Sequence, residues 1–175
     1  MDILPLLQAH DDAVAALLER CFGPARRQRT ASLLREGASR IDTASFVVLD
    51  GELLVGAVQC FRLHWRRLDG CIRDLALLGP LVSHPDRRGE GIGLVLMQRA
   101  TGRLDALGQS AMLIGDEPYY GRFGFSATAT GRWRLPGPVD PARLLLRSTQ
   151  PGFFDAEARV SAAAGCATPC ANRAA

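Results

Sequence analysis

One segment decides the fold of this chain: Leu78-Gly79-Pro80-Leu81-Val82-Ser83-His84-Pro85-Asp86-Arg87-Arg88-Gly89-Glu90-Gly91-Ile92-Gly93-Leu94-Val95-Leu96-Met97. An apolar strand is predicted to end at the His-Pro pair, a loop with three alternating glycines follows, and an amphipathic helix begins directly after it. Glycine lets the backbone adopt positive φ angles and approach a ligand closely. The unpaired N–H groups at the start of the helix attract an anion, and two adjacent arginines add charge-assisted donors. The segment therefore predicts a diphosphate-binding loop.

Known phosphate-binding patterns can be compared with this loop. A P-loop ends in Gly-Lys-Ser/Thr, whereas this chain contains no lysine. A dinucleotide fingerprint has the order G-x-G-x-x-G, and its third glycine would fall on Leu94. The spacing that fits is Arg88-x-x-Gly91-x-Gly93 after a strand. For this hexapeptide alone, an ordinary glycine-rich strand-to-helix turn is the alternative.

A second motif follows a short strand expected at 111–114: Asp116-Glu117-Pro118-Tyr119-Tyr120-Gly121-Arg122-Phe123-Gly124-Phe125. Together, the two motifs resemble the GNAT N-acetyltransferase superfamily. Its Gln/Arg-x-x-Gly-x-Gly/Ala signature binds the pyrophosphate of acetyl-coenzyme A, and an aromatic-Tyr-x-x-x-Gly-Phe segment lies at this place. With Leu-Gly-Pro-Leu-Val before the loop and Leu135-Pro136-Gly137-Pro138-Val139 later, the chain is similar to the YhbS-like branch. The resemblance covers residues 3–152.

Composition is that of one globular domain. The chain has 175 residues, of which 47% are apolar and 22% charged, and this length is enough to bury a normal core. The net charge of +3 is too small to indicate nucleic-acid binding. No signal peptide or membrane-spanning run is present, so we expect a cytoplasmic protein that binds neither nucleic acid nor membranes. We predict no metal site, because Cys166 and Cys170 have no histidine nearby.

The densest basic stretch is Arg26-Arg27-Gln28-Arg29. A solvated helix face is the favoured interpretation over an RNA contact. The stretch could also help to attract a polyanionic cofactor.

Hydrophobic periodicity and turn residues predict the elements. Strands are expected at 3–7, 45–49, 53–63, 71–82, 111–114, from 124 onward and at 144–146, and helices at 11–22, 25–36, 91–107 and 118–123. The resemblance implies an α/β (α+β) GNAT fold. In that fold a mixed, mostly antiparallel sheet of six to seven strands is flanked by about four helices, and its fourth and fifth strands splay apart. A single domain is expected over 1–155 and a disordered tail over 156–175.

The resemblance also implies a cofactor site for acetyl-coenzyme A, the acetyl donor. The backbone of the strand segment before the loop would bind the pantetheine arm, and an N–H there can polarise the thioester carbonyl. Ser83 stands where valine is more usual, which affects side-chain packing rather than the main-chain role. The carboxylate of Glu90 should point away from the phosphates. The strand residues are Leu81, Val82 and Ser83, and the pyrophosphate cradle is Arg88, Gly89, Glu90, Gly91, Ile92 and Gly93.

Tyr120 matches the tyrosine that acts as general acid in the family. A phenol within hydrogen-bond reach can protonate a departing thiolate, although an aromatic residue that only packs on a helix face is the alternative. Tyr119 is interpreted as a packing residue. The general base stays unassigned, because Leu77 occupies the position of the glutamate that histone-type relatives use. The candidates by sequence proximity are Asp74, His84, Asp116 and Glu117, with a water relay as the other option.

The resemblance therefore implies an N-acetyltransferase that acts on a primary amine of a small molecule or a protein. The resemblance also implies direct transfer through a ternary complex. No cysteine indicates an acyl-enzyme, since Cys60 and Cys71 fall within predicted strands, where thiols are commonly buried and inert. The alternative is a non-catalytic module that binds or senses acyl-coenzyme A and needs the loop but not Tyr120. An RNA-acetylating protein would need a larger basic surface. No segment indicates the acceptor or the oligomeric state.

Overall fold

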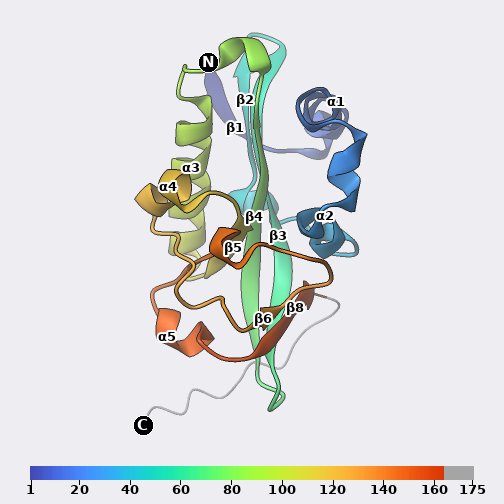
Figure 1. The fold of residues 1–175 in the computed structure, drawn as a ribbon. Coiled ribbons are helices and arrows are strands. Elements are labelled where there is room, and N and C mark those ends of the chain that lie inside the picture. The colour runs from blue at the N-terminus through green and yellow to red at the C-terminus, as the bar shows by residue number, and fades with distance from the viewer. Residues whose placement is uncertain (164–175) are drawn as a thin grey trace.

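The computed structural model describes residues 1–163, and Figure 1 shows how their helices and strands are arranged. The α-helices are α1 (Asp11–Phe22), α2 (Thr30–Arg35), α3 (Ile92–Ala106), α4 (Glu117–Tyr120) and α5 (Pro151–Phe154). The strands are β1 (Asp2–Pro5), β2 (Phe46–Asp50), β3 (Leu53–Arg67), β4 (Ile72–Ser83), β5 (Ala111–Ile114), β6 (Trp133–Arg134), β7 (Leu144–Arg147) and β8 (Ala158–Ala162). Short 3-10 helices occur at Gln8–His10, Pro24–Gln28, Asp42–Ala44, Pro85–Arg87, Gly121–Phe123 and Pro141–Arg143.

The strands form one mixed, mostly antiparallel sheet, so the expected fold class is confirmed. The strand order is β1-β2-β3-β4-β5-β7, and β8 pairs with β3 and with β6. β4 and β5 are parallel, as are β6 and β8. The described residues contain eight strands rather than the predicted six to seven, because β8 pairs with the end of β3 and β6 pairs with β8. No described helix is long and apolar enough to cross a bilayer.

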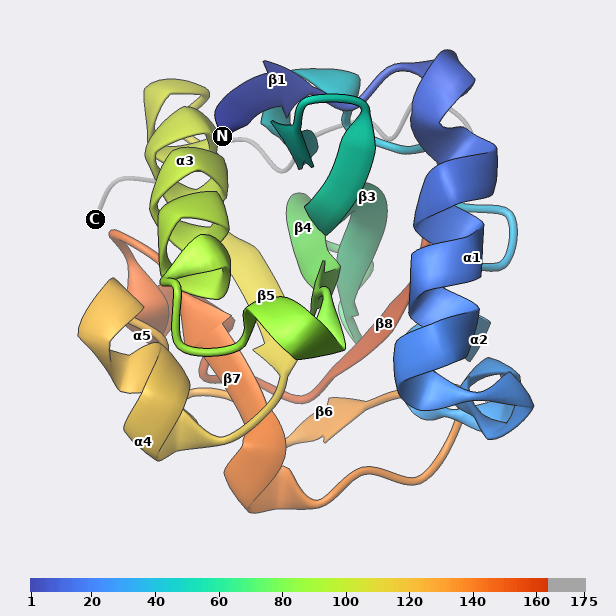
Figure 2. The ribbon, with the colours of Figure 1, turned by 90° about the horizontal axis from the view of Figure 1, so that it is seen from above.

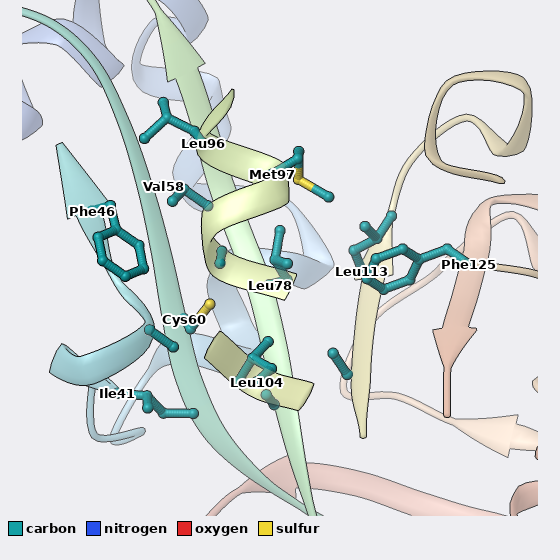
Figure 3. Packing of buried hydrophobic residues seen from close by; sticks show 14 of the residues in the cluster. Ile41, Phe46, Val58, Cys60, Leu78, Leu96, Met97, Leu104, Leu113 and Phe125 are labelled. Atoms are coloured by element: carbon teal, nitrogen blue, oxygen red, sulfur yellow. The ribbon is translucent and has the colours of Figure 1, made fainter. Parts of the chain in front are cut away.

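Helices cover both faces of the sheet, with α3 on one side and α1 and α2 on the other (Figure 2). The apolar stripe of α3, which includes Leu96, Met97 and Leu104, packs against Val58 and Leu78 of the sheet (Figure 3). On the opposite face, α1 packs against β2, β3 and β4. Its buried side chains are Val14 and, three and four residues later, Leu17 and Leu18. This helical spacing is the one that the sequence predicts.

The helix predicted at 25–36 is wrong as a single element. The structure has a 3-10 helix at Pro24–Gln28 and then α2, with Arg29 in an extended conformation between them (φ −73°, ψ 146°). The Thr30 hydroxyl donates a hydrogen bond to the Pro138 carbonyl (2.5 Å). This contact across 108 residues fixes the start of α2, and no local pattern encodes it. The strand predicted from Gly124 onward is reduced to one isolated bridge between Ser126 and Leu146.

The predicted start of the tail at 156 is also wrong. β8 pairs with β3 between Leu63 and Arg67, and its Ala158 and Val160 side chains are buried against the cluster around Trp65. Tertiary pairing outweighs the weak local preference of a segment rich in alanine and serine. The remainder of the predicted tail, with Cys166 and Cys170, lies outside the described residues.

A substitution on the buried side of β8 should destabilise the protein. Val160→Asp places a charge where the valine side chain is 3% exposed, and the unfolding free energy should fall by about 3 kcal/mol or more. Ser161→Asp, on the exposed face of the same strand, is the matched control and should change stability little. Denaturant titration measures both. Equal stability of Val160→Asp and wild type would mean that β8 is not part of the folded core.

Candidate active site

β4 and β5 pair only over a short stretch and then separate. Their register partners are Ala76 with Ala111 and Leu77 with Met112. Beyond this point β4 bulges, and its register with β3 shifts around Gly79-Pro80. Because Pro80 has no N–H, it cannot donate to a neighbouring strand. Residues 81–83 keep their pairing with β3 on one side, while their other edge is not paired with β5. The structure thus places the strand residues that the sequence assigned to the pantetheine arm at an open edge.

The glycine loop leads from this edge into α3. Gly89 and Gly91 have φ angles of +89° and +77°, and Gly91 is the N-cap of α3. A Cβ added at either position would meet no atom within 4 Å, so both glycines border open space. The N–H groups of the first turn of α3 have no partner within the helix, as at every helix start. This combination fits a diphosphate.

The two arginines of the loop differ in their surroundings. Arg87 Nη1 binds Asp50 Oδ2 (2.7 Å), and Arg87 Nε binds Glu90 Oε1 (2.6 Å). The hydrogen bond from Arg87 holds the pKa of the Glu90 carboxyl below its usual range. Glu90 therefore directs its charge to Arg87. Arg88 forms no ion pair with any residue of 1–163, so its guanidinium is the available one.

Tyr120 lies at the end of α4 and is partly buried. Its ring packs edge-on against Tyr119 (centroids 4.9 Å apart) and against Phe125 (6.4 Å). Burial raises the pKa of the Tyr120 phenol, the charges of Tyr119 and Asp116 act in the same direction, and Arg143 opposes them. A raised pKa keeps the phenol protonated at neutral pH, which suits a proton donor.

Tyr119 connects this helix to the glycine loop. Its hydroxyl lies 3.2 Å from the point where a Cβ of Gly93 would stand. Gly93 therefore makes room for this hydroxyl at the first turn of α3. The ring of Tyr119 packs against Tyr120 and Phe123, in keeping with the packing role that the sequence suggests, but its hydroxyl reaches the loop.

Gly115 makes room for the Tyr120 ring. A Cβ at this position would lie 2.3 Å from Tyr120 Cε2 and 2.7 Å from Cδ2. Gly115→Ala should therefore displace the ring, and we expect kcat to fall by about tenfold or more, since small misplacements of a catalytic group are costly. Gly121→Ala, whose Cβ would meet its nearest atom at 4.0 Å, is the control. Unchanged kcat in Gly115→Ala would indicate that the position of the Tyr120 ring does not affect the rate.

A cleft of about 770 Å³ opens beside Tyr120, between the open edge of β4 and the α1–α2 side of the molecule. Apolar residues form one part of its wall, and arginines with hydroxyl residues form another. Its lining residues are Leu18, Phe22, Arg26, Gln28, Arg29, Thr30, Ala31, Ser32, Arg35, Pro80, Leu81, Ile114, Tyr120, Pro138, Val139, Asp140 and Arg143. Arg26 and Arg29 of the basic stretch therefore line the cleft, which corrects the interpretation of that stretch as a solvated helix face.

Comparison with known protein families shows which family has this fold and this loop. The family model described as "Acetyltransferase (GNAT) domain" matches residues 3–128. The chain belongs to the GNAT acetyltransferase family. No curated protein matches it. Its fold is similar to that of YhbS, a GNAT family N-acetyltransferase from Escherichia coli solved in complex with CoA, at 20% identity and a TM-score of 0.71, covering 93% of this chain and 89% of that one.

Two further solved GNAT structures have the same fold with lower scores. One is a GNAT family acetyltransferase from Brucella melitensis in complex with acetyl-CoA, at 21% identity and a TM-score of 0.55, covering 85% of this chain and 96% of that one. The other is Naa50 from Arabidopsis thaliana in complex with a bisubstrate analogue, CoA-Ac-MVNAL, at 16% identity and a TM-score of 0.53, covering 84% and 97%. At these identities the comparisons show the fold.

In this GNAT domain the base candidates named from the sequence do not line the cleft. Asp74 faces His64 (3.5 Å) near the start of β4. His84 is held by Arg20, whose Nη1 lies 3.0 Å from its Nε2. Asp116 pairs with Arg143 (3.0 Å) at the start of α4. The three groups stabilise local structure instead, and Glu117, also on α4, is not among the lining residues.

The carboxylate that does line the cleft is Asp140, which the sequence analysis missed. Its Oδ1 accepts a hydrogen bond from the Ala142 N–H (3.0 Å) and so caps a 3-10 helix. No motif marks Asp140, because it reaches the cleft only through the path of the loop before β7.

The cysteines of the GNAT domain give no indication of an acyl-enzyme. Cys60 is fully buried in β3, and burial raises the pKa of its thiol to about 12, so a nucleophilic thiolate does not form there. Cys71 lies directly before β4 rather than within it. Cys21 of α1 donates a hydrogen bond from Sγ to the Ser83 carbonyl (3.6 Å), which links α1 to the end of β4.

Proposed function

We propose that the protein is an acetyl-coenzyme A-dependent N-acetyltransferase that transfers an acetyl group directly to a primary amine. One observation carries the proposal. The adjacent residues Tyr119 and Tyr120 join two sites, since the Tyr119 hydroxyl lies at Gly93 of the glycine loop and Tyr120 lines the cleft. A donor held by the loop and an acceptor held in the cleft would therefore meet beside Tyr120.

The expected roles follow from the open edge of β4. The first turn of α3, with Gly89, Gly91 and Arg88, would hold the pyrophosphate. The backbone of residues 81–83 would hold the pantetheine arm, and an N–H there would stabilise the oxyanion formed on the thioester carbonyl. The YhbS and Brucella structures, solved with CoA and acetyl-CoA, support this choice of donor.

The transfer breaks the C–S bond of the thioester and forms a C–N bond. The attacking amine must first lose its ammonium proton, which we assign to water, because the arginines that line the cleft lower the pKa of an ammonium group bound there. Tyr120 then gives a proton to the departing thiolate. With water as the base, kcat/KM should rise with pH up to the pKa of the acceptor's own ammonium group.

The test is the release of free thiol from acetyl-coenzyme A in the presence of amine pools, with mass spectrometry to find the acetylated product. We expect thiol release that depends on an amine, together with one product heavier by an acetyl group. The competing function, a non-catalytic acyl-coenzyme A-binding module, predicts binding of acetyl-coenzyme A with no amine-dependent thiol release. Absence of binding would contradict both. The cytoplasmic location and the single-domain organisation stay predictions.

A further inference from the structure

The cleft beside Tyr120 is lined by more positive than negative side chains. Four arginines line it, Arg26, Arg29, Arg35 and Arg143, against a single carboxylate, Asp140. The arginines come from two distant parts of the chain, the segment around α2 and the loop before β7. Their neighbours determine how much of this positive charge is available to a ligand.

Two of the four arginines have an acidic neighbour. Arg143 Nε lies 3.0 Å from Asp116 Oδ1. Arg26 Nε lies 3.5 Å from Glu19 Oε2, and these two buried atoms have no hydrogen-bond partner. Asp140 Oδ1 accepts a hydrogen bond from the Ala142 N–H, and the Asp140 carboxylate forms no ion pair with any of the four arginines. The other two arginines of the cleft, Arg29 and Arg35, form no ion pair with any residue of 1–163.

Of the two arginines without an acidic neighbour, Arg29 is exposed to solvent, and Arg35 is the partly buried one. It forms no ion pair with any residue of 1–163, although it is partly buried. Burial, together with the charge of Arg26, lowers the pKa of the Arg35 guanidinium to about 10, so it still carries its charge at neutral pH. A desolvated cation without an acid binds an anionic group strongly, because the group supplies the missing partner.

The Arg35 side chain is held in place by contacts that do not neutralise it. Its Nη2 donates to Ser32 Oγ (2.7 Å), and Ser32 Oγ donates in turn to the Arg26 carbonyl (2.7 Å). Its guanidinium lies over the Phe61 ring, 5.9 Å from the centroid. A guanidinium fixed in this way loses little entropy when it binds a ligand.

The rest of the cleft is suited to an apolar body. Leu18, Phe22, Ile114 and Val139 line it together with Pro80 and Leu81. A ligand that fits all of these walls has a reactive amine near Tyr120, an apolar portion and an anionic end. The glycine loop, by contrast, precedes α3, which lies on the opposite side of the sheet from α2 (Figure 2). Arg35 is therefore separated from the site expected for the pyrophosphate.

We propose that the acceptor is a small amine that carries an anionic group, and that Arg35 binds this group. The inference rests on the proposed function and adds the chemical class of its acceptor. The anionic group can be the carboxylate of an amino acid or the phosphate of an amino sugar phosphate. Arg35 is then the residue that determines specificity for charge.

The experiment compares acceptors that differ in charge. Leucine, leucinamide and isoamylamine share one side chain, and only leucine carries a carboxylate, on the carbon that bears the amine. Glucosamine 6-phosphate and glucosamine form the second matched pair. We expect kcat/KM to be about 10- to 100-fold higher for the anionic member of at least one pair, the range for one charge-assisted hydrogen-bonded contact. The pair with the larger ratio identifies carboxylate or phosphate.

Arg35→Gln should remove this preference. The anionic-to-neutral ratio should fall to near one, while the KM for acetyl-coenzyme A stays close to that of wild type, and Arg35→Lys should restore part of the ratio. Arg27→Gln is the matched control, because Arg27 is 74% exposed and does not line the cleft. A ratio that Arg35→Gln does not change, or a wild-type preference for the neutral amines, would overturn the proposal.

A binding measurement separates this proposal from the proposed function. N-acetyl-leucine and N-acetyl-leucinamide, at equal concentration, are compared as stabilisers against thermal unfolding. If N-acetyl-leucine stabilises wild type more strongly than it stabilises Arg35→Gln, the anion site is supported. This conclusion holds even if no amine releases thiol, because a lack of thiol release contradicts only the acetyltransferase proposal. Equal stabilisation by both compounds, and by N-acetylglucosamine 6-phosphate and N-acetylglucosamine compared in the same way, contradicts the anion site, whatever the turnover.

Discussion

Replacing Tyr120 with Phe should lower kcat by about 10²–10⁴-fold, the range for the loss of a general acid. The ring and its contacts with Tyr119 and Phe125 remain, so the thermal midpoint should stay close to that of wild type. The KM for acetyl-coenzyme A should also be nearly unchanged, because proton donation to the thiolate matters mainly in the transition state. Steady-state kinetics with thiol detection measures these quantities.

Tyr119→Phe is the matched control for this experiment. It removes a hydroxyl from the neighbouring ring, at Gly93 rather than in the cleft, and should affect acetyl-coenzyme A binding more than kcat. Since the pKa of Tyr120 is raised above its usual value of 10.0, deprotonation of the acid should limit the wild-type rate only above that pH. The loss of a general acid should lower kcat by far more than about threefold. If kcat of Tyr120→Phe stays within that range of wild type, the thiolate leaves without help from Tyr120.

Gly91→Glu should abolish acetyl-coenzyme A binding. In wild type, a hundredfold excess of ligand over its dissociation constant stabilises the fold by about 2.7 kcal/mol, which corresponds to a rise of about 5–10 °C in the unfolding midpoint for a domain of this size. The glutamate side chain would enter the open space beside the first turn of α3 and place a negative charge where the pyrophosphate is expected. Thermal unfolding with and without ligand measures the difference.

Gly108→Glu separates this effect from backbone strain. Gly108 follows the other end of α3, has a similar φ of +63°, and also has no atom within 4 Å of an added Cβ. Both variants should lose some stability without ligand, because a side chain at positive φ is strained. Only Gly108→Glu should keep the stabilisation by acetyl-coenzyme A. Ligand stabilisation that persists in Gly91→Glu would contradict the assignment of the loop, and so would its absence in wild type.

Elements with strong local signals were predicted well. The helix expected at 91–107 is observed at Ile92–Ala106, and the strand expected at 71–82 is observed at Ile72–Ser83. Glycines at 89 and 91 adopt the positive φ angles that the loop interpretation requires. In these segments the hydrophobic period, the turn residues and the tertiary structure agree, so neighbouring residues in the sequence are sufficient to determine the conformation.

β8 shows where a local signal existed but was too weak. Ala158, Val160 and Ala162 alternate with Arg159 and Ser161, which is the period of a half-buried strand. Alanine and serine have low strand preference, so the composition favoured a tail. The pairing with β3 provides the missing stabilisation, because backbone hydrogen bonds and burial against Trp65 do not depend on local preference.

The sequence by itself determined the glycine loop, the helix that follows it, the strand that leads into it and the family to which they belong. Only the tertiary structure decided which charges meet. Arg35 and Arg143 are 108 positions apart, yet both line one cleft, and Asp140 joins them there without any motif. Conformation at a glycine or along an amphipathic helix depends on covalent neighbours, which the sequence lists in order. The availability of a charge depends on its desolvation and on the acids within a few ångströms, and folding brings those together from distant parts of the chain.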